Sequence, residues 1–319
     1  MKLGCSSSSY GSSFAEGRLD LDEWLRVCAE DLELDGVELL DAHFAATDPM
    51  YLRAIKKLCA DLQLTISAIA VTSDFGADDH RAREREKVKQ WCDIAAIIGA
   101  PVVRVFAGWI PVKRSEVPAG RLIRAFRRVF GEPPPNARRI WSDVTAALRD
   151  CADYAAERGV VLGLQNQRGS LASTPAQVAQ LVHGVGSPWM RICVDPAGFG
   201  STAGVDALLT QAVQAHAHLR DVQEDGSDAP VVWPELLRLL RLGHFRGFLH
   251  IDYDGSEAPE TAVPRAVVYL RGTLHLLDRQ QLLQSPTPTP EPPPARQNGG
   301  VSAIDIVRGA FAAEVPAHS

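Results

Sequence analysis

Residues 160–167 read VVLGLQNQ, an apolar run that ends in polar residues, and this pattern recurs through the second half of the chain. Three later runs repeat it: RICVDPAG at 191–198, HAHLRD at 216–221 and GFLHIDYDG at 247–255. The polar residues at the run ends are Gln165, Asp195, His218 and Asp252. They are 30, 23 and 34 residues apart, close to the roughly 30 residues of a βαβ unit. Consecutive strands of a barrel would bring these four side chains to one mouth.

Eight apolar runs are spread along the whole chain. They lie at residues 2–5, 36–40, 64–71, 101–106, 160–165, 190–195, 215–221 and 247–253. Segments with apolar residues at helical spacing separate them, and such alternation is typical of βα repeats with a parallel sheet. We therefore predict an α/β fold, the closed (β/α)₈ TIM barrel. The alternative, an open doubly wound sheet, usually has a glycine-rich phosphate loop after its first strand, where this chain reads CSSSSYGSS at 5–13.

Two helix starts carry capping signals. Ser142 precedes DVTAAL, and Thr174 precedes PAQVAQLV, in which Pro175 suits the first helical turn. We predict that each of these two residues is the N-cap of its helix.

Two segments depart from the repeat. Residues 109–139 form an insertion with eight Lys and Arg residues, which is either a cationic lid over an anionic substrate or a solvated helix face. The tail contains SPTPTPEPPP at 285–294, typical of an extended Pro-rich linker. The sequence thus predicts a barrel at residues 1–280, a Pro/Gly-rich linker at 281–300, and a short amphipathic segment at 301–319 that docks or stays disordered.

Composition excludes several classes of function. A formal net charge of −6 argues against nucleic acid or an anionic membrane as a partner. No stretch approaches the roughly 18 apolar residues that a membrane span requires, and the N-terminus MKLGCSSSSYG lacks the apolar region of a signal peptide. The six cysteines are scattered without a CxxC motif. We therefore expect reduced core cysteines, a cytoplasmic location and a small-molecule substrate. The sequence is compatible with a homo-oligomer but does not predict the oligomeric state.

The order and spacing of several segments resemble the sugar phosphate isomerase/epimerase family of xylose isomerase-like TIM barrels. The early segments are DGVEL at 35–39, SAIA at 67–70 with DF at 74–75, and IGAPVVRVF at 98–106; the later ones are GLQNQ, VDPAG, HLRD and HIDYDG. The resemblance covers about residues 1–280. It is specific for the family but not for one reaction.

This resemblance implies a metal site. Family members typically hold a divalent metal with Glu, Asp, His and Glu at the ends of the fifth to eighth strands, and the two glutamates also shuttle protons. The matching residues here are Gln165, Asp195, His218 and Asp252. Such oxygen and imidazole ligands suit Mn²⁺, Mg²⁺, Co²⁺ or Zn²⁺. Because Gln165 carries no charge and Asp252 is one methylene short, we expect weak metal binding, or none.

Each position also has a plainer interpretation. Asp195 before Pro196 could start a turn. His216 shares a strand face with His218, so one of the two histidines fills the barrel interior. Asp254 is the alternative to Asp252 as a ligand. Gln167 stands where the family often has histidine, which removes another acid.

Gln165 restricts the chemistry, because an amide cannot accept a proton at neutral pH. Of the two catalytic positions, Gln165 and Asp252, only Asp252 can act as a general base. This disfavours a symmetrical two-carboxylate epimerisation and leaves a one-base dehydration or aldose–ketose isomerisation. The residues expected to bind substrate at the mouth are Glu38, Arg104, Asn166, Arg168 and Arg220.

The sequence thus favours a metal-dependent isomerase, epimerase or dehydratase-like enzyme acting on a sugar, cyclitol or related polyhydroxy carbonyl compound through an enediolate. The alternative is a catalytically degenerate barrel that binds a sugar-like ligand or a protein partner. The related DNA-repair endonuclease branch is disfavoured, because it needs a zinc cage rich in His and Glu and this chain is acidic.

Overall fold

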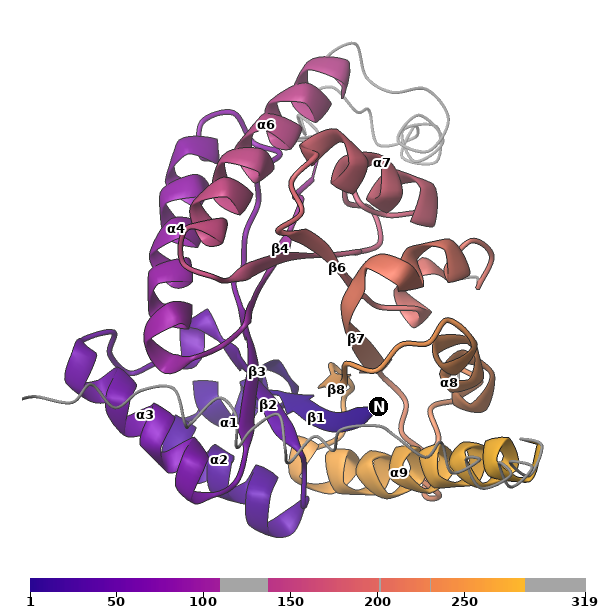
Figure 1. Ribbon diagram of the computed structural model, residues 1–319. Helices are drawn as coiled ribbons and strands as arrows, with labels where there is room; N and C mark the ends of the chain where they lie inside the picture. Colours follow the sequence, from indigo (N-terminus) through magenta and orange to yellow (C-terminus); the bar gives the residue numbers. More distant parts are fainter. Residues whose placement is uncertain (110–136, 201, 230, 285–319) are drawn as a thin grey trace, which may run out of the picture. The chain divides into compact units, whose positions relative to one another are not determined.

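The computed structural model describes residues 1–109, 137–200, 202–229 and 231–284 (Figure 1). Eight parallel strands pair in chain order, and β1 pairs with β8 to close a barrel. The strands are β1 (Lys2–Ser6), β2 (Gly36–Leu40), β3 (Thr65–Ala70), β4 (Val102–Phe106), β5 (Val161–Gln165), β6 (Met190–Val194), β7 (Ala212–Leu219) and β8 (Phe248–Tyr253). The predicted TIM barrel is confirmed, and each of the eight predicted runs overlaps a strand, although β7 begins three residues before its run.

Helices on the outside of the barrel connect the strands (Figure 1). They are α1 (Gly11–Ala15), α2 (Leu21–Arg26), α3 (Pro49–Asp61), α4 (Arg81–Ile98), α6 (Ala137–Ala156), α7 (Pro175–Val185), α8 (Trp233–Leu242) and α9 (Pro259–Gln284). The chain divides into two compact units, Met1–Leu277 and Asp278–Ser319. The first unit holds the barrel, and of the second only the end of α9 is described. The expected lid, most of the expected linker and the C-terminal segment lie outside the described residues.

One of the two predicted helix caps is confirmed. The Thr174 hydroxyl accepts a hydrogen bond from the Gln177 backbone N–H, and the Gln177 side chain accepts one from the Thr174 backbone N–H. This reciprocal pair is a capping box, and Pro175 occupies the first turn. The Ser142 prediction is wrong, because α6 begins at Ala137. The residues ARRIW before Ser142 include good helix formers, which extend the helix upstream.

The strands are buried on both faces, as expected for a parallel sheet covered by helices. The six cysteines are buried and free, as predicted from their scattered positions. No helix in the described part of the chain is both long and apolar enough to cross a membrane.

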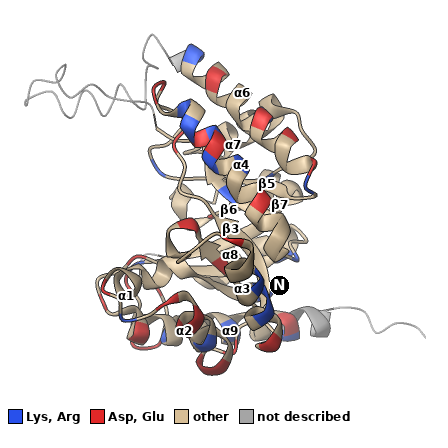
Figure 2. Ribbon diagram, turned by 90° about the vertical axis from the view of Figure 1, so that its left-hand side faces the viewer, with Lys and Arg blue, Asp and Glu red and all other residues tan. Residues whose placement is uncertain are grey.

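The seam between α4 and α6 is rich in ion pairs. Both helices carry charged residues along their length (Figure 2). Asp150 on α6 lies 2.7 Å from Arg85 and 2.8 Å from Lys89 on α4, and Asp143 on α6 lies 3.4 Å from Arg81 on α4. Exposed pairs contribute little singly, but a network of them fixes how two helices align.

The barrel interior is unusually polar. TIM barrels commonly fill this space with branched apolar side chains, whereas here it contains buried polar ones: Glu38, Ser67, Arg104, Gln214, His216 and His250. Gln214 on β7 hydrogen-bonds Glu38 on β2, and Ser67 on β3 hydrogen-bonds His250 on β8. Because these strands are not neighbours, the contacts cross the interior. Buried polar groups persist only where they are paired, so this cluster is the place to look for function.

Candidate active site

The carboxyl ends of β5 to β8 hold the four predicted ligand residues. His218 Nδ1 lies 3.2 Å from Asp195 Oδ2, so these two side chains are in direct contact. Asp252 is the register partner of His218 on the neighbouring strand. Gln165 ends β5 with only 3% of its surface exposed, and its Oε1 atom is buried without a hydrogen-bond partner. A buried acceptor without a partner is costly unless a ligand or ion supplies one.

Asp195 is held firmly by its neighbours. The Asn166 side chain accepts a hydrogen bond from the Asp195 backbone N–H at 2.8 Å and donates one to the Asp195 backbone oxygen at 2.9 Å. The Gly198 N–H donates to Asp195 Oδ1 at 2.9 Å. Asn166, expected to bind substrate, thus uses both ends of its amide group to position Asp195.

Gly198 allows this close approach. A Cβ at residue 198 would lie 2.4 Å from Asp195 Oδ2 and 3.1 Å from Asn166 Nδ2. We expect Gly198→Ala to lower the free energy of unfolding by about 1–3 kcal/mol, the usual cost of overpacking. Urea denaturation followed by circular dichroism measures this. The control is Gly272→Ala on α9, where a Cβ meets nothing within 4 Å and stability should not fall; equal curves for the two variants would contradict the prediction.

His218 lies between two carboxylates. Its Nε2 atom is 3.1 Å from Asp254 Oδ2, opposite the Asp195 contact. Burial alone would lower the pKa of His218, but Asp195, Asp252 and Asp254 together raise it to about 9. Asp254 also accepts from Arg220 Nε at 3.1 Å. A histidine that binds metal through one nitrogen is commonly oriented by an acceptor on the other, and Asp254 stands in that position.

Asp252 has partners on both oxygens. Its Oδ1 atom accepts a hydrogen bond from the Ser8 hydroxyl at 2.8 Å, and its Oδ2 atom lies 3.6 Å from His216 Nδ1. Burial would raise the pKa of Asp252, but His216 and Arg104 hold it well below its usual range. Asp252 is therefore ionised at neutral pH, and these partners make it a weaker base than an unpaired carboxylate.

Behind the mouth, Glu38 is fully buried and makes four polar contacts. Its Oε1 atom lies 2.8 Å from the Ser6 hydroxyl and 3.2 Å from Arg104 Nη2. Its Oε2 atom lies 2.7 Å from Gln214 Nε2 and 3.4 Å from His216 Nε2. Burial would raise the pKa of Glu38, but Arg104 and His216 hold it well below its usual range.

His216 joins this interior to the mouth. It lies between Glu38 and Asp252, and although burial would lower the pKa of His216, these carboxylates raise it to about 9. Two anions and two cations therefore form one set, which we call the charge tetrad: the buried residues Glu38, Arg104 and His216, and Asp252, whose side chain is 19% exposed.

His250 differs from His216 in its protonation state. Burial lowers the pKa of His250 to about 3, so the ring is neutral. The Ser67 hydroxyl donates to the Val37 carbonyl, so His250 Nε2–H donates to Ser67 Oγ at 2.6 Å. His250 Nδ1 then accepts from Gln214 Nε2 at 2.7 Å.

Sequence reasoning missed one candidate metal site. Among the residues that the structure describes, Glu38, His216 and His250 form a group whose ligand atoms all lie within 4.8 Å of one another. The Gln214 amide nitrogen contacts both Glu38 and His250, so an ion at this site would have to displace it. The sequence feature that could have revealed this group is the two-residue period of a strand. It places His216 on the face of His218, and His250 on the face of Asp252.

The residues expected to bind substrate are not gathered in one place. Glu38 and Arg104 are buried in the interior, and Asn166 is bound to the Asp195 backbone. Arg168 and Arg220 are exposed, and Arg220 is bound to Asp254 at the rim. Among the described residues, these two arginines and the half-exposed Asp254 offer charge at the surface near the mouth.

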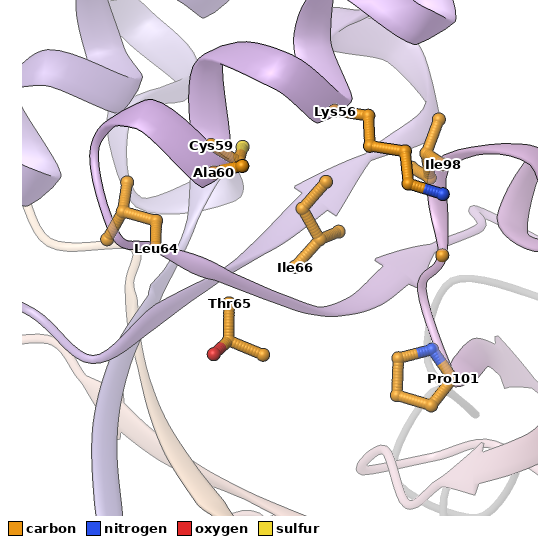
Figure 3. Close-up of a pocket in the computed structure, with 9 residues that line it drawn as sticks. Lys56, Cys59, Ala60, Leu64, Thr65, Ile66, Ile98 and Pro101 are labelled. Carbon is orange, nitrogen blue, oxygen red and sulfur yellow. The ribbon is translucent and has the colours of Figure 1, made fainter.

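A separate pocket of about 320 Å³ lies at the opposite end of the strands (Figure 3). It is lined by the start of β3, by α3 and by the end of α4, with residues such as Cys59, Leu64, Ile66 and Ile98. Lys56 at its edge donates to the Ile97 carbonyl at 3.2 Å. The pocket is distant in the fold from the strand ends that hold Asp195 and His218.

Comparison with known proteins gives a family and a fold. The model of the family described as "Xylose isomerase-like TIM barrel" matches residues 28–273. A search of curated proteins found no match.

Solved structures with the same fold include three sugar epimerases. An L-ribulose 3-epimerase is 17% identical with a TM-score of 0.67, and the match covers 91% of this chain and 99% of the epimerase chain. A 3-keto-D-glucoside 4-epimerase from E. coli is 15% identical with a TM-score of 0.64, covering 85% and 99%. A D-psicose 3-epimerase solved in the presence of D-fructose is 14% identical with a TM-score of 0.63, covering 86% and 98%. At these identities the likeness concerns the fold alone.

Proposed function

The chain belongs to the xylose isomerase-like TIM barrel family, and from this membership we propose that it is a divalent-metal-dependent isomerase, epimerase or dehydratase-like enzyme. Its substrate class is a sugar, cyclitol or related polyhydroxy carbonyl compound. The observation that carries the proposal is the direct contact between Asp195 and His218 at the barrel mouth. The relatives of known structure that are named as sugar epimerases support the substrate class.

The donor types at the mouth suit a hard divalent cation, but among the described residues Asp195, His218 and Asp252 do not bring their ligand atoms within 4.8 Å of one another, so an ion would have to draw them together. Asp195 and Asp252 supply negative charge, His218 supplies an imidazole oriented by Asp254, and Gln165 supplies the buried oxygen that lacks a partner. When bound, such an ion would polarise a substrate carbonyl and acidify the neighbouring C–H bond. In the interior group, Gln214 already bonds Glu38 and Nδ1 of His250, and Ser67 bonds Nε2 of His250, whereas both ring nitrogens of His216 lack a hydrogen-bond partner. An ion there would have to displace Gln214, so this group fits less well.

The chain's own residues restrict the reaction. Asp252 is the ionised carboxylate placed to accept a proton, and Ser8 and His216 fix its two oxygens. Gln165, at the other family glutamate position, cannot share this role. A one-base isomerisation or dehydration is therefore favoured over a symmetrical epimerisation.

Metal binding tests this proposal. Protein purified without chelator should contain a divalent metal or bind Mn²⁺ on titration, measured by elemental analysis and calorimetry. Asp195→Ala should weaken Mn²⁺ binding on the order of tenfold or more, since it removes a charged ligand. Asp225→Ala, in an exposed loop, is the control and should leave the affinity unchanged. A wild-type chain that holds neither Mn²⁺ nor Zn²⁺ after soaking would exclude the metalloenzyme.

The second candidate is a barrel that binds a sugar-like ligand without catalysis. The neutral Gln165 and the hydrogen-bonded interior group favour it, since both reduce the capacity for metal. A screen of sugars and cyclitols separates the two functions: binding without turnover, in the presence of Mn²⁺, would support the second.

A further inference from the structure

The serine-rich segment after β1 connects the buried interior to the mouth. The Ser6 hydroxyl lies 2.8 Å from Glu38 Oε1, and the Ser8 hydroxyl lies 2.8 Å from Ser6 Oγ. The Ser8 hydroxyl also lies 2.8 Å from Asp252 Oδ1. The Ser6 hydroxyl donates to Glu38 on β2, and the Ser8 hydroxyl donates to Asp252 on β8. The two serines thus form a bridge of contacts between two carboxylates, in which each proton goes to its carboxylate and none lies between the serine oxygens.

The neighbouring serine fixes the backbone on both sides of Asp252. The Ser9 hydroxyl donates to the Ile251 carbonyl at 3.0 Å and accepts from the Tyr253 N–H at 3.0 Å. Ser8 thus contacts the side chain of residue 252 while Ser9 contacts the backbone before and after it. Two successive residues thus hold this part of β8 at three points, one on the Asp252 carboxylate and two on the backbone beside it.

The inner end of the bridge is rigid. Ser6 and Glu38 are fully buried, and Glu38 is fixed by Arg104 and Gln214. The Ser6 oxygen, fixed in this way, limits where the Ser8 hydroxyl can lie.

We propose that Ser8 is the positioning residue of Asp252. It holds Oδ1 and thereby turns Oδ2 toward His216, which sets the direction in which the carboxylate meets a metal or substrate. The consequence for binding rests on the proposed function, whereas the coupling between Ser8 and Asp252 does not.

A double-mutant cycle measures this coupling in the full chain. Ser8→Ala should lower the folding equilibrium constant roughly tenfold, the scale of one hydrogen bond to a charged group. In an Asp252→Ala background the same change should cost less than about twofold. Equal effects in both backgrounds would overturn the proposal. Should Asp252→Ala fail to fold, the conservative variant decides: Ser8→Thr keeps the hydroxyl and should retain stability, and a loss equal to that of Ser8→Ala would overturn the proposal.

Mn²⁺ affinity gives a readout that a merely structural serine would not change. Ser8→Ala should weaken Mn²⁺ binding roughly tenfold, as is typical when the partner of a metal ligand is removed. Ser8→Thr and the control Ser12→Ala, on the exposed side of α1, should stay within about twofold of the wild type. An unchanged affinity in Ser8→Ala would overturn positioning. Failure of the wild type to bind Mn²⁺ would instead reject the proposed function, and the folding cycle would still decide the role of Ser8.

Discussion

Glu38→Ala is expected to lower the free energy of unfolding by about 3–5 kcal/mol, because removing one partner of a buried charge pair leaves the other uncompensated. The glutamate is fully buried and balances Arg104 and His216. Its loss would also leave the Ser6 hydroxyl without its acceptor and the Gln214 amide with only one of its two acceptors, His250. Arg104 is itself only 3% exposed, so water cannot solvate its guanidinium group in place of the lost carboxylate.

Urea denaturation of Glu38→Ala beside Glu86→Ala tests this expectation. Glu86 is an exposed glutamate on α4, so its removal should change stability by less than about 0.5 kcal/mol. A further variant, Glu38→Ala with Arg104→Met, should be more stable than the sum of the two single changes predicts, because both charges then leave together. A loss below about 1 kcal/mol in Glu38→Ala would show that the tetrad does not depend on this carboxylate.

Gln165→Glu is expected to tighten Mn²⁺ binding on the order of tenfold to a hundredfold, because ligand charge sets the affinity of a site for hard cations. The amide oxygen of Gln165 is already buried at the end of β5 without a partner. The variant replaces it with a charged oxygen at the same reach. In the absence of metal the added carboxylate should destabilise the chain, since a buried charge needs a partner.

Calorimetric titration with Mn²⁺ measures this gain, and Gln223→Glu is its control. The control adds the same charge at an exposed residue that follows β7, so it separates ligation from long-range attraction. Equal gains in the two variants, or none in Gln165→Glu, would contradict a ligand role for residue 165. If a native activity is found and Gln165→Glu abolishes it, the glutamine serves a reaction other than that of the family glutamate.

The strands and the mouth could be predicted because they depend on local signals. Short apolar runs that end in polar residues predict strand ends, and a βα repeat then fixes their order around the barrel. The contact between Asp195 and His218 follows from this order alone. The position of Asn166 could not be predicted, since it depends on which backbone groups of the next strand lack a partner.

The interior could not be predicted for a different reason. Its contacts join residues far apart in the chain, such as Glu38 with Gln214 and Ser8 with Asp252. Such pairs depend on the register of every strand and on how side chains cross a closed barrel. The strand period indicated that His216 and His250 face inward, but it carried no information about which partner each would meet.

The charge tetrad has a consequence for how this site can change over time. Its four members stand on β2, β4, β7 and β8 and balance one another, so a substitution at one of them alters the charge that the other three experience. Descendants of this chain should therefore replace them together rather than one at a time. For the same reason, an engineer who introduces glutamate at residue 252 would have to redesign Ser8 and His216 in the same step.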